Sequence, residues 1–177
     1  MIQNERDIRS ELVVQAARQM MVAARTAPKG KGIDILEMAL VSGEDKKRLA
    51  EEMQQISIDR EWKFFLRDAE NVLQADVVMI IGSRQQNQGL DCSHCGYDTC
   101  ESKPSITPCA INTVDLGIAV GSACAKAADL RVDTRVMFSA GFAAQRLGML
   151  GDGCGCVMAI PVSASSKNPF FDRKPKE

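Results

Sequence analysis

Four cysteines stand close together in the middle of the chain. They are Cys92, Cys95, Cys100 and Cys109, with the spacing C-x2-C-G-x3-C-x8-C over eighteen residues. Three closely spaced thiolates can wrap one side of a 4Fe–4S cube while a fourth arrives from further along the chain. Gly96 can adopt the positive φ that lets the backbone curl around the sulfurs. The spacing therefore predicts a 4Fe–4S cluster held by these four residues.

Two other interpretations of the four cysteines stay open. Structural zinc also takes four cysteines, although its usual form is a pair of C-x2-C knuckles, and the second pair here is spaced x8. The loop could also bind neither group. His94, the only histidine, lies between Cys92 and Cys95. It would either ligate the metal, tune a cluster by hydrogen bonding, or be an exposed loop residue, and we expect the last.

The other three cysteines lie further along the chain. Cys124 stands among alanines in an expected helix, where a small thiol is usually buried. Cys154 and Cys156 flank a glycine and would either cap a metal, form a redox pair or have no shared role. With one histidine and no nucleophile elbow, a hydrolytic triad is not supported.

Composition narrows the classes of function. Among 177 residues, 22 Lys and Arg oppose 23 Asp and Glu, so the net charge of −1 offers no polycationic surface for nucleic acid or anionic lipid. The apolar fraction of 45% is enough for a folded core. Residues 1–9 lack the apolar stretch of a secretory signal, and no apolar run reaches the ~20 residues that cross a bilayer. We expect a cytoplasmic protein without a membrane partner, whose thiols are kept reduced.

Periodicity predicts the elements that must position the cysteines. Apolar residues at spacings of three and four predict helices, and short apolar runs closed by glycine or turns predict strands. Asp59 is expected to cap a helix with Trp62, Phe65, Leu66, Ala69 and Leu73 on one side. Phe170 and Phe171 are expected to anchor the tail. The expected helices cover residues 5–27, 46–56, 59–73, 114–130 and 134–147, and the expected strands cover 33–41, 77–81 and 156–162.

These elements predict one domain of the α+β class (α/β-type) over residues 1–177. Residues 83–112 are polar, then rich in cysteine, and form an embedded loop within it. A segment of about thirty residues without structure of its own is uncommon in a compact domain and is usually functional. We therefore expect the bound cluster to hold this loop in place.

The chain resembles a known family over nearly its whole length. The cysteine core is similar to that of small 4Fe–4S domains, and the whole sequence resembles the ferredoxin domain-containing proteins called DUF2148. This resemblance implies a cluster but no agreed reaction. The matching stretches are residues 23–30, the cysteine loop, residues 115–122 and residues 167–173.

A second resemblance concerns the order of elements outside the loop. Residues 24–28, the two late helices, the strand ending at Ile160 and Pro161, and residues 173–175 are similar to the nitroreductase family. That resemblance implies a mixed sheet flanked by helices and a homodimer with FMN at its interface. Carried over by position, Lys29, Lys31, Arg173 and also Lys174 become candidates to bind the FMN phosphate. The family's Pro-Ser-x-x-Asn-x-Gln-Pro-Trp pattern is absent beyond Pro28.

Two functions follow as hypotheses. In the first, the protein is an oxidoreductase in which a 4Fe–4S cluster exchanges electrons with FMN, for electron transfer or reduction of a small molecule. In the second, it is a flavin-free, ferredoxin-like electron carrier or a cluster-bearing interaction module. The expected partners are a redox protein or a small-molecule electron acceptor, together with a second copy of the chain.

Overall fold

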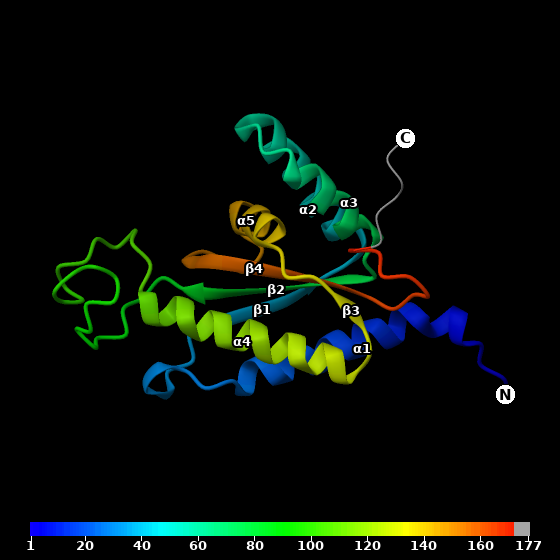
Figure 1. Ribbon diagram of the computed structural model, residues 1–177, viewed down its shortest axis with the longest axis horizontal. Coiled ribbons are helices and arrows are strands. Elements are labelled where there is room, and N and C mark those ends of the chain that lie inside the picture. Colours follow the sequence, from blue (N-terminus) through cyan, green and yellow to red (C-terminus); the bar gives the residue numbers. More distant parts are fainter. Residues whose placement is uncertain (172–177) are drawn as a thin grey trace.

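Four strands form one sheet with helices on both faces (Figure 1). The computed structural model describes residues 1–171. The strand order is β1-β2-β4-β3, and all three pairings are antiparallel, where the resemblance implied a mixed sheet. The elements in chain order are α1 (Glu5–Thr26), the short helix η1 (Gly30–Gly32), β1 (Leu36–Val41), α2 (Gly43–Arg60), α3 (Phe64–Gln74), β2 (Val77–Arg84), α4 (Ala110–Asp129), β3 (Asp133–Thr134), α5 (Phe138–Arg146) and β4 (Cys154–Ser163).

The central strand β2 is buried on both faces, as its apolar run predicts. It pairs with β1 from Val41 opposite Val78 to Leu36 opposite Ser83. On its other side it pairs with β4, beginning at Val77 opposite Val162. The strand continues past Gly82 to Arg84, and this extension carries the chain to the edge where the cysteine loop begins.

Two cores lie on opposite faces of the sheet. Helices α1 and α4 cover one face, where small residues of α4 such as Ala119 and Ala123 are fully buried against α1 and the sheet. Helices α2, α3 and α5 cover the other face around Phe65 and Met53. The two layers fix β2 and α4, which are the two elements that hold the ends of the cysteine loop.

The prediction for residues 59–73 was partly wrong. Asp59 lies inside α2 rather than capping the next helix, because α2 continues to Arg60 and ends at Glu61, whose φ is 57°. Helix α3 begins only at Phe64. Its buried residues include Phe65, Ala69 and Val72, whereas Leu66 and Leu73, which were expected on the same side, are exposed.

The helix expected over 134–147 begins later. Thr134 belongs to the short strand β3, and Met137 is bridged to Ala159, donating its N–H to the Ala159 carbonyl at 2.8 Å. Pairing with β4 holds this segment extended, so α5 begins at Phe138. In the tail, Phe170 is buried as expected, whereas Phe171 is 59% exposed beneath the Arg135 guanidinium.

None of the helices described within residues 1–171 is long and apolar enough to span a bilayer.

Candidate metal centre and adjoining cavity

The cysteine loop, residues 85–109, projects beyond the end of the sheet (Figure 1). It leaves the end of β2 and returns at the first residue of α4. Two side chains hold its first part to the body: Asn112 Nδ2 donates to the Gln86 carbonyl at 2.6 Å, and Lys31 Nζ donates to the Gln88 carbonyl at 3.0 Å. The loop is therefore irregular but anchored to rigid elements.

The loop curls through residues with positive φ. Gly96 has a φ of 87°, as predicted, and Ser93 has a φ of 58°. The Gly96 N–H donates to the Ser93 carbonyl at 2.9 Å. Further along, the Cys100 N–H donates to Asp91 Oδ1 at 2.7 Å, and Asn87 Nδ2 donates to the Cys100 carbonyl at 2.8 Å. These bonds fold residues 91–100 into a compact ring.

All four predicted ligands line one small cavity between this ring and the start of α4. Within residues 1–171, no three His, Cys, Asp or Glu side chains are close enough to hold a single metal ion. A tetrahedral zinc site would bring its four sulfurs to about 3.8 Å from one another, given Zn–S bonds of about 2.3 Å. A 4Fe–4S cube instead places each thiolate on a different iron and spreads them further apart. The residues lining the cavity include Gln88, Leu90, Cys92, Cys95, Cys100, Lys103, Cys109 and Ile111.

Cys109 has the most distinctive environment of the four cysteines. It is buried and directly precedes α4. Burial raises the pKa of its thiol, but the peptide N–H groups of Asn112, Gln88 and Ile111, with the Lys103 ammonium, outweigh that effect and leave the pKa below its ordinary value. This environment favours a thiolate, which is the form that binds metal.

Gln88 is a buried amide that lines the same cavity. The residue is 2% exposed, and neither its Nε2 nor its Oε1 has a hydrogen-bond partner. Buried polar groups are nearly always paired, so each exception calls for an explanation. The four cysteines and this unpaired amide fit a group that brings hydrogen-bonding capacity of its own, as the sulfides of an iron–sulfur cluster do.

A larger cavity of about 660 Å³ adjoins the cysteine ring. Its volume lies within the range typical of small-molecule sites. Cys109 and Lys103 line both cavities. The apolar part of the lining comes from α4, α5 and β4, and includes Leu116, Val120, Phe138, Phe142, Val157 and Met158. The polar part is rich in carboxamides, and includes Gln85, Gln86, Asn87, Asn112 and Gln145.

Asn112 is the best-defined polar group of the larger cavity. It is 2% exposed, and its Nδ2 is committed to the Gln86 carbonyl, which leaves Oδ1 as an acceptor without a partner. A ligand that donates an N–H or O–H would satisfy it.

Lys103 separates the two cavities. It is 8% exposed, and its Nζ donates to the Pro104 carbonyl at 3.3 Å and to the Thr107 carbonyl. Both bonds are to neutral carbonyl oxygens, so the lysine brings a buried positive charge to the wall that the two cavities share. Nothing in the sequence distinguishes Lys103, Gln88 or Asn112 from ordinary polar loop residues, because only tertiary packing buries them.

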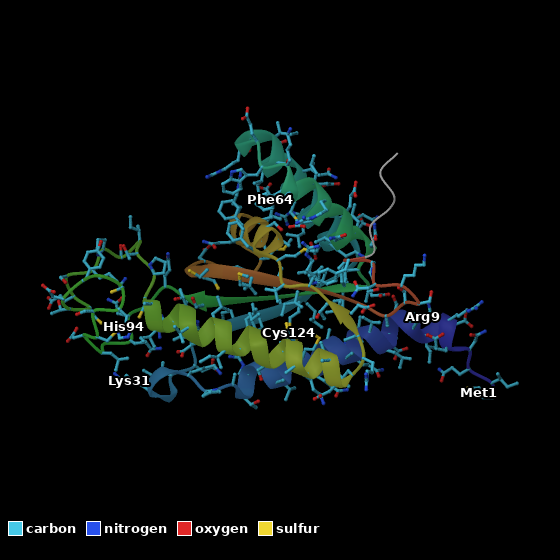
Figure 2. All side chains as sticks on the ribbon, in the orientation of Figure 1. Met1, Arg9, Lys31, Phe64, His94 and Cys124 are labelled. Atoms are coloured by element: carbon cyan, nitrogen blue, oxygen red, sulfur yellow. The ribbon has the colours of Figure 1, made fainter. Side chains whose placement is uncertain are left out.

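The lysines predicted to bind FMN phosphate lie elsewhere. Lys29 Nζ donates to the carbonyls of Arg25 and Ala27 at the end of α1, at 2.6 and 2.9 Å. Lys31 lies beside the cysteine loop (Figure 2), bound to Gln88. Neither lysine lines the larger cavity. Arg173 and Lys174 lie outside the described residues.

The remaining candidates are separated from the cysteine ring. His94 is exposed on the loop, with Nδ1 at 2.8 Å from the Cys92 carbonyl, and it does not line the small cavity. Cys124 lies partway along α4, away from the loop (Figure 2), and burial raises its pKa. These positions agree with the exposed histidine and the packed thiol expected from the sequence.

Cys154 and Cys156 face different cores because of a bulge in β4. Ile81 pairs with Met158 and Ser83 with Gly155, so Cys156 and Val157 together oppose Gly82, and Cys156 has a φ of 50°. As a result Cys154 packs against the core under α5, and Cys156 packs against the core under α4. Burial raises the pKa of both thiols, that of Cys154 to about 11. The two thiols are free, and their packing on opposite faces does not favour a redox pair.

One family model and one related protein match this chain in sequence. A family model described as "Uncharacterized protein containing a ferredoxin domain (DUF2148)" matches residues 106–173. A protein of Archaeoglobus fulgidus, described only as uncharacterized, is 39% identical to this chain over 187 residues. The alignment covers the full length of both chains.

Solved structures of nitroreductase-type proteins share the fold. A putative NADH dehydrogenase/NAD(P)H nitroreductase from Bacteroides thetaiotaomicron has a TM-score of 0.58 at 14% identity, covering 92% of this chain and 78% of that one. A nitroreductase family protein from Clostridium novyi NT has a TM-score of 0.56 at 12% identity, covering 85% and 73%. The NADPH:FMN oxidoreductase from Vibrio harveyi complexed with NAD+ has a TM-score of 0.59 at 13% identity, covering 92% and 63%. At these identities the likeness confirms the predicted α+β, nitroreductase-like fold.

Proposed function

This chain belongs to the ferredoxin domain-containing family DUF2148, and on that premise we propose that it is a redox protein holding a 4Fe–4S cluster. The ligands are Cys92, Cys95, Cys100 and Cys109. The observation that carries this proposal is that all four line one cavity at the end of the sheet. The spacing C-x2-C-G-x3-C-x8-C lacks the second C-x2-C knuckle that is usual for structural zinc, and this favours a cube.

The chain's own residues prepare the site for an anionic group. Such a cluster supplies electron storage at a potential set by its surroundings. Peptide N–H groups and the Lys103 ammonium face the Cys109 sulfur and offset the negative charge of the bound thiolates. The loop holds its shape through bonds such as Cys100 N–H to Asp91, which positions the sulfurs before the group binds.

The larger cavity is the proposed place for an electron partner of the cluster, and FMN is the first candidate. The aromatic pair Phe138 and Phe142, with ring centroids 5.7 Å apart, borders an apolar lining suited to a flat ring system. Asn112 lines this cavity, and its buried Oδ1 is an acceptor without a partner among the described residues. Because Cys109 lines both cavities, a ligand bound here would lie one side chain from the cluster. The oxidoreductase from Vibrio harveyi, whose fold is similar, is named for FMN.

A flavin-free electron carrier is the second candidate. Among the described residues, the larger cavity has two cations, Arg84 and Lys103, and Arg84 is paired with Glu37. Lys29 and Lys31 bind backbone carbonyls outside the larger cavity, so neither lies where it could contact a phosphate bound there. The role of these lysines and of Arg173 in FMN binding, and the expected homodimer, stay predictions.

Anaerobic purification with metal, sulfide and flavin analysis of one sample tests both candidates. The cluster requires about four irons and four sulfides per chain. FMN released by acid would support the flavoprotein, and a full cluster without flavin would select the carrier. Stoichiometric zinc without sulfide would contradict the proposed function.

A further inference from the structure

Gln88 is held in place by its backbone but not by its side chain. Its carbonyl accepts a hydrogen bond from Lys31 Nζ at 3.0 Å, and its peptide N–H faces the Cys109 sulfur. The side chain is buried against the cysteine cavity with both polar atoms unpaired. The backbone thus fixes an amide in a position where the chain itself offers no partner.

The other side of Gln88 is closed by the turn after α1. Gly30 donates its N–H to both carboxylate oxygens of Asp115, at 3.0 and 2.9 Å, which docks the turn on α4. A Cβ at Gly30 would lie 2.8 Å from Ile111 Cγ2 and 3.7 Å from Gln88 Cδ, so the turn packs directly against this side chain. The amide is therefore confined between this turn and the cysteine cavity.

The chemistry of the cavity decides which end of the amide would be used. A glutamine amide carries two N–H donors and one carbonyl acceptor. Cysteine thiolates and cluster sulfides are anionic and only accept hydrogen bonds. Hydrogen bonds to these sulfurs are among the features that set the reduction potential of an iron–sulfur cluster. A donor stabilises the reduced form more, because that form carries one more negative charge.

We propose that Gln88 contacts the cluster directly and donates a side-chain N–H to one of its sulfurs, which raises the reduction potential. The proposal rests on the proposed 4Fe–4S function and assigns a fifth contact besides the four cysteines. It also accounts for the buried unpaired amide, which the bound group satisfies.

Two length-matched variants test this proposal. Gln88→Met removes the donor while keeping the side-chain length, and Gln88→Glu removes it and adds a negative charge. The midpoint potential is measured by an anaerobic spectroscopic redox titration of the purified holoprotein. We expect Gln88→Met to shift the reduction equilibrium at least tenfold toward the oxidised form, about 59 mV for a one-electron couple. Gln88→Glu should shift it further in the same direction.

A second measurement separates this role from a structural one. In the metal-free protein the amide has no partner, so Gln88→Met should unfold at a temperature no lower than the wild-type chain. A structural glutamine would instead make the metal-free variant less stable. Gln54→Met is the control, because Gln54 is exposed on α2 and lines neither cavity, and the potential of this variant should equal that of the wild type.

The outcomes are distinct. A wild-type chain without iron and sulfide would refute the proposed function and this inference together. A full cluster in Gln88→Met whose reduction equilibrium constant differs from the wild-type value by less than tenfold would refute only the inference. Folded Gln88→Met that binds no iron would refute it as well, since Gln88 would then be needed for assembly rather than for the potential.

Discussion

The seven cysteines occupy two kinds of environment. Four lie in the irregular loop of residues 85–109, around one cavity bordered by peptide N–H groups and a buried lysine. The other three lie on α4 and β4, where they pack against apolar cores on either face of the sheet. Burial in the absence of donors raises the pKa of these three thiols, whereas donors around Cys109 lower its pKa despite burial. The same side chain thus lines a cavity with hydrogen-bond donors in one region, where we propose that it binds a cluster, and packs against apolar residues in the other.

The largest expected difference between the two regions is in metal binding. Cys109→Ala should reduce bound iron from about four per chain to near zero, because it removes one of the four thiolates that hold the cube. Iron and sulfide analysis after anaerobic purification measures this. Cys124→Ala is the control and should retain the wild-type content. Equal iron in the two variants would remove the distinction between the regions.

In the packed region, added side-chain volume should have the largest effect on the free energy of unfolding. Gly141→Ala in α5 would place a Cβ 2.1 Å from the Val157 carbonyl oxygen of β4. The obstructing atoms belong to the β4 backbone and cannot rotate away as a side chain could. We therefore expect a loss of about 3 kcal/mol in the free energy of unfolding. Gly121→Ala in α4 is the matched control, since nothing lies within 4 Å of its Cβ, and helix propensity should stabilise it by up to about 1 kcal/mol. Denaturant unfolding compares them, and a harmless Gly141→Ala would contradict the close packing of α5 on β4.

The smallest expected effect concerns thiol reactivity in the packed region. Burial raises the pKa of Cys154 to about 11, so its thiolate fraction at pH 8 is about a hundredth of that of an ordinary thiol. The greater nucleophilicity of a high-pKa thiolate offsets part of this, which leaves alkylation about tenfold slower. Iodoacetamide labelling followed by mass spectrometry should show that Cys154 is alkylated more slowly in the folded chain than in the denatured chain. The rate should rise with pH up to about 11, and a plateau near pH 9 would contradict it.

Patterns within one segment predicted much of the fold. The apolar run before Gly82 predicted the central strand, and periodic apolar residues predicted α1 and α4 to within a few residues. Errors arose where distant partners decide the backbone. Met137 is extended because it pairs with Ala159, and α2 ends at Glu61 through a left-handed residue that its composition does not reveal.

The candidate site divides in the same way. Cysteine spacing predicted which four thiols share a cavity, because ligands close in sequence are close in space. Burial of Gln88, Lys103 and Asn112 depends on the turn after α1 and on the α4 surface, which lie far away in the sequence. A sequence pattern can therefore indicate which thiols lie together but not the residues that surround them.

The hydrogen bond from Asn112 to the Gln86 carbonyl joins the two ends of the cysteine loop at its base. Since β2 and α4 are fixed by their own cores, the segment beyond this junction has little influence on the sheet. Loops closed by rigid ends tolerate changes in length at small entropic cost. The cysteine loop can therefore be regarded as a module, whose length and cysteine spacing can be changed by design while the sheet and its helices stay the same.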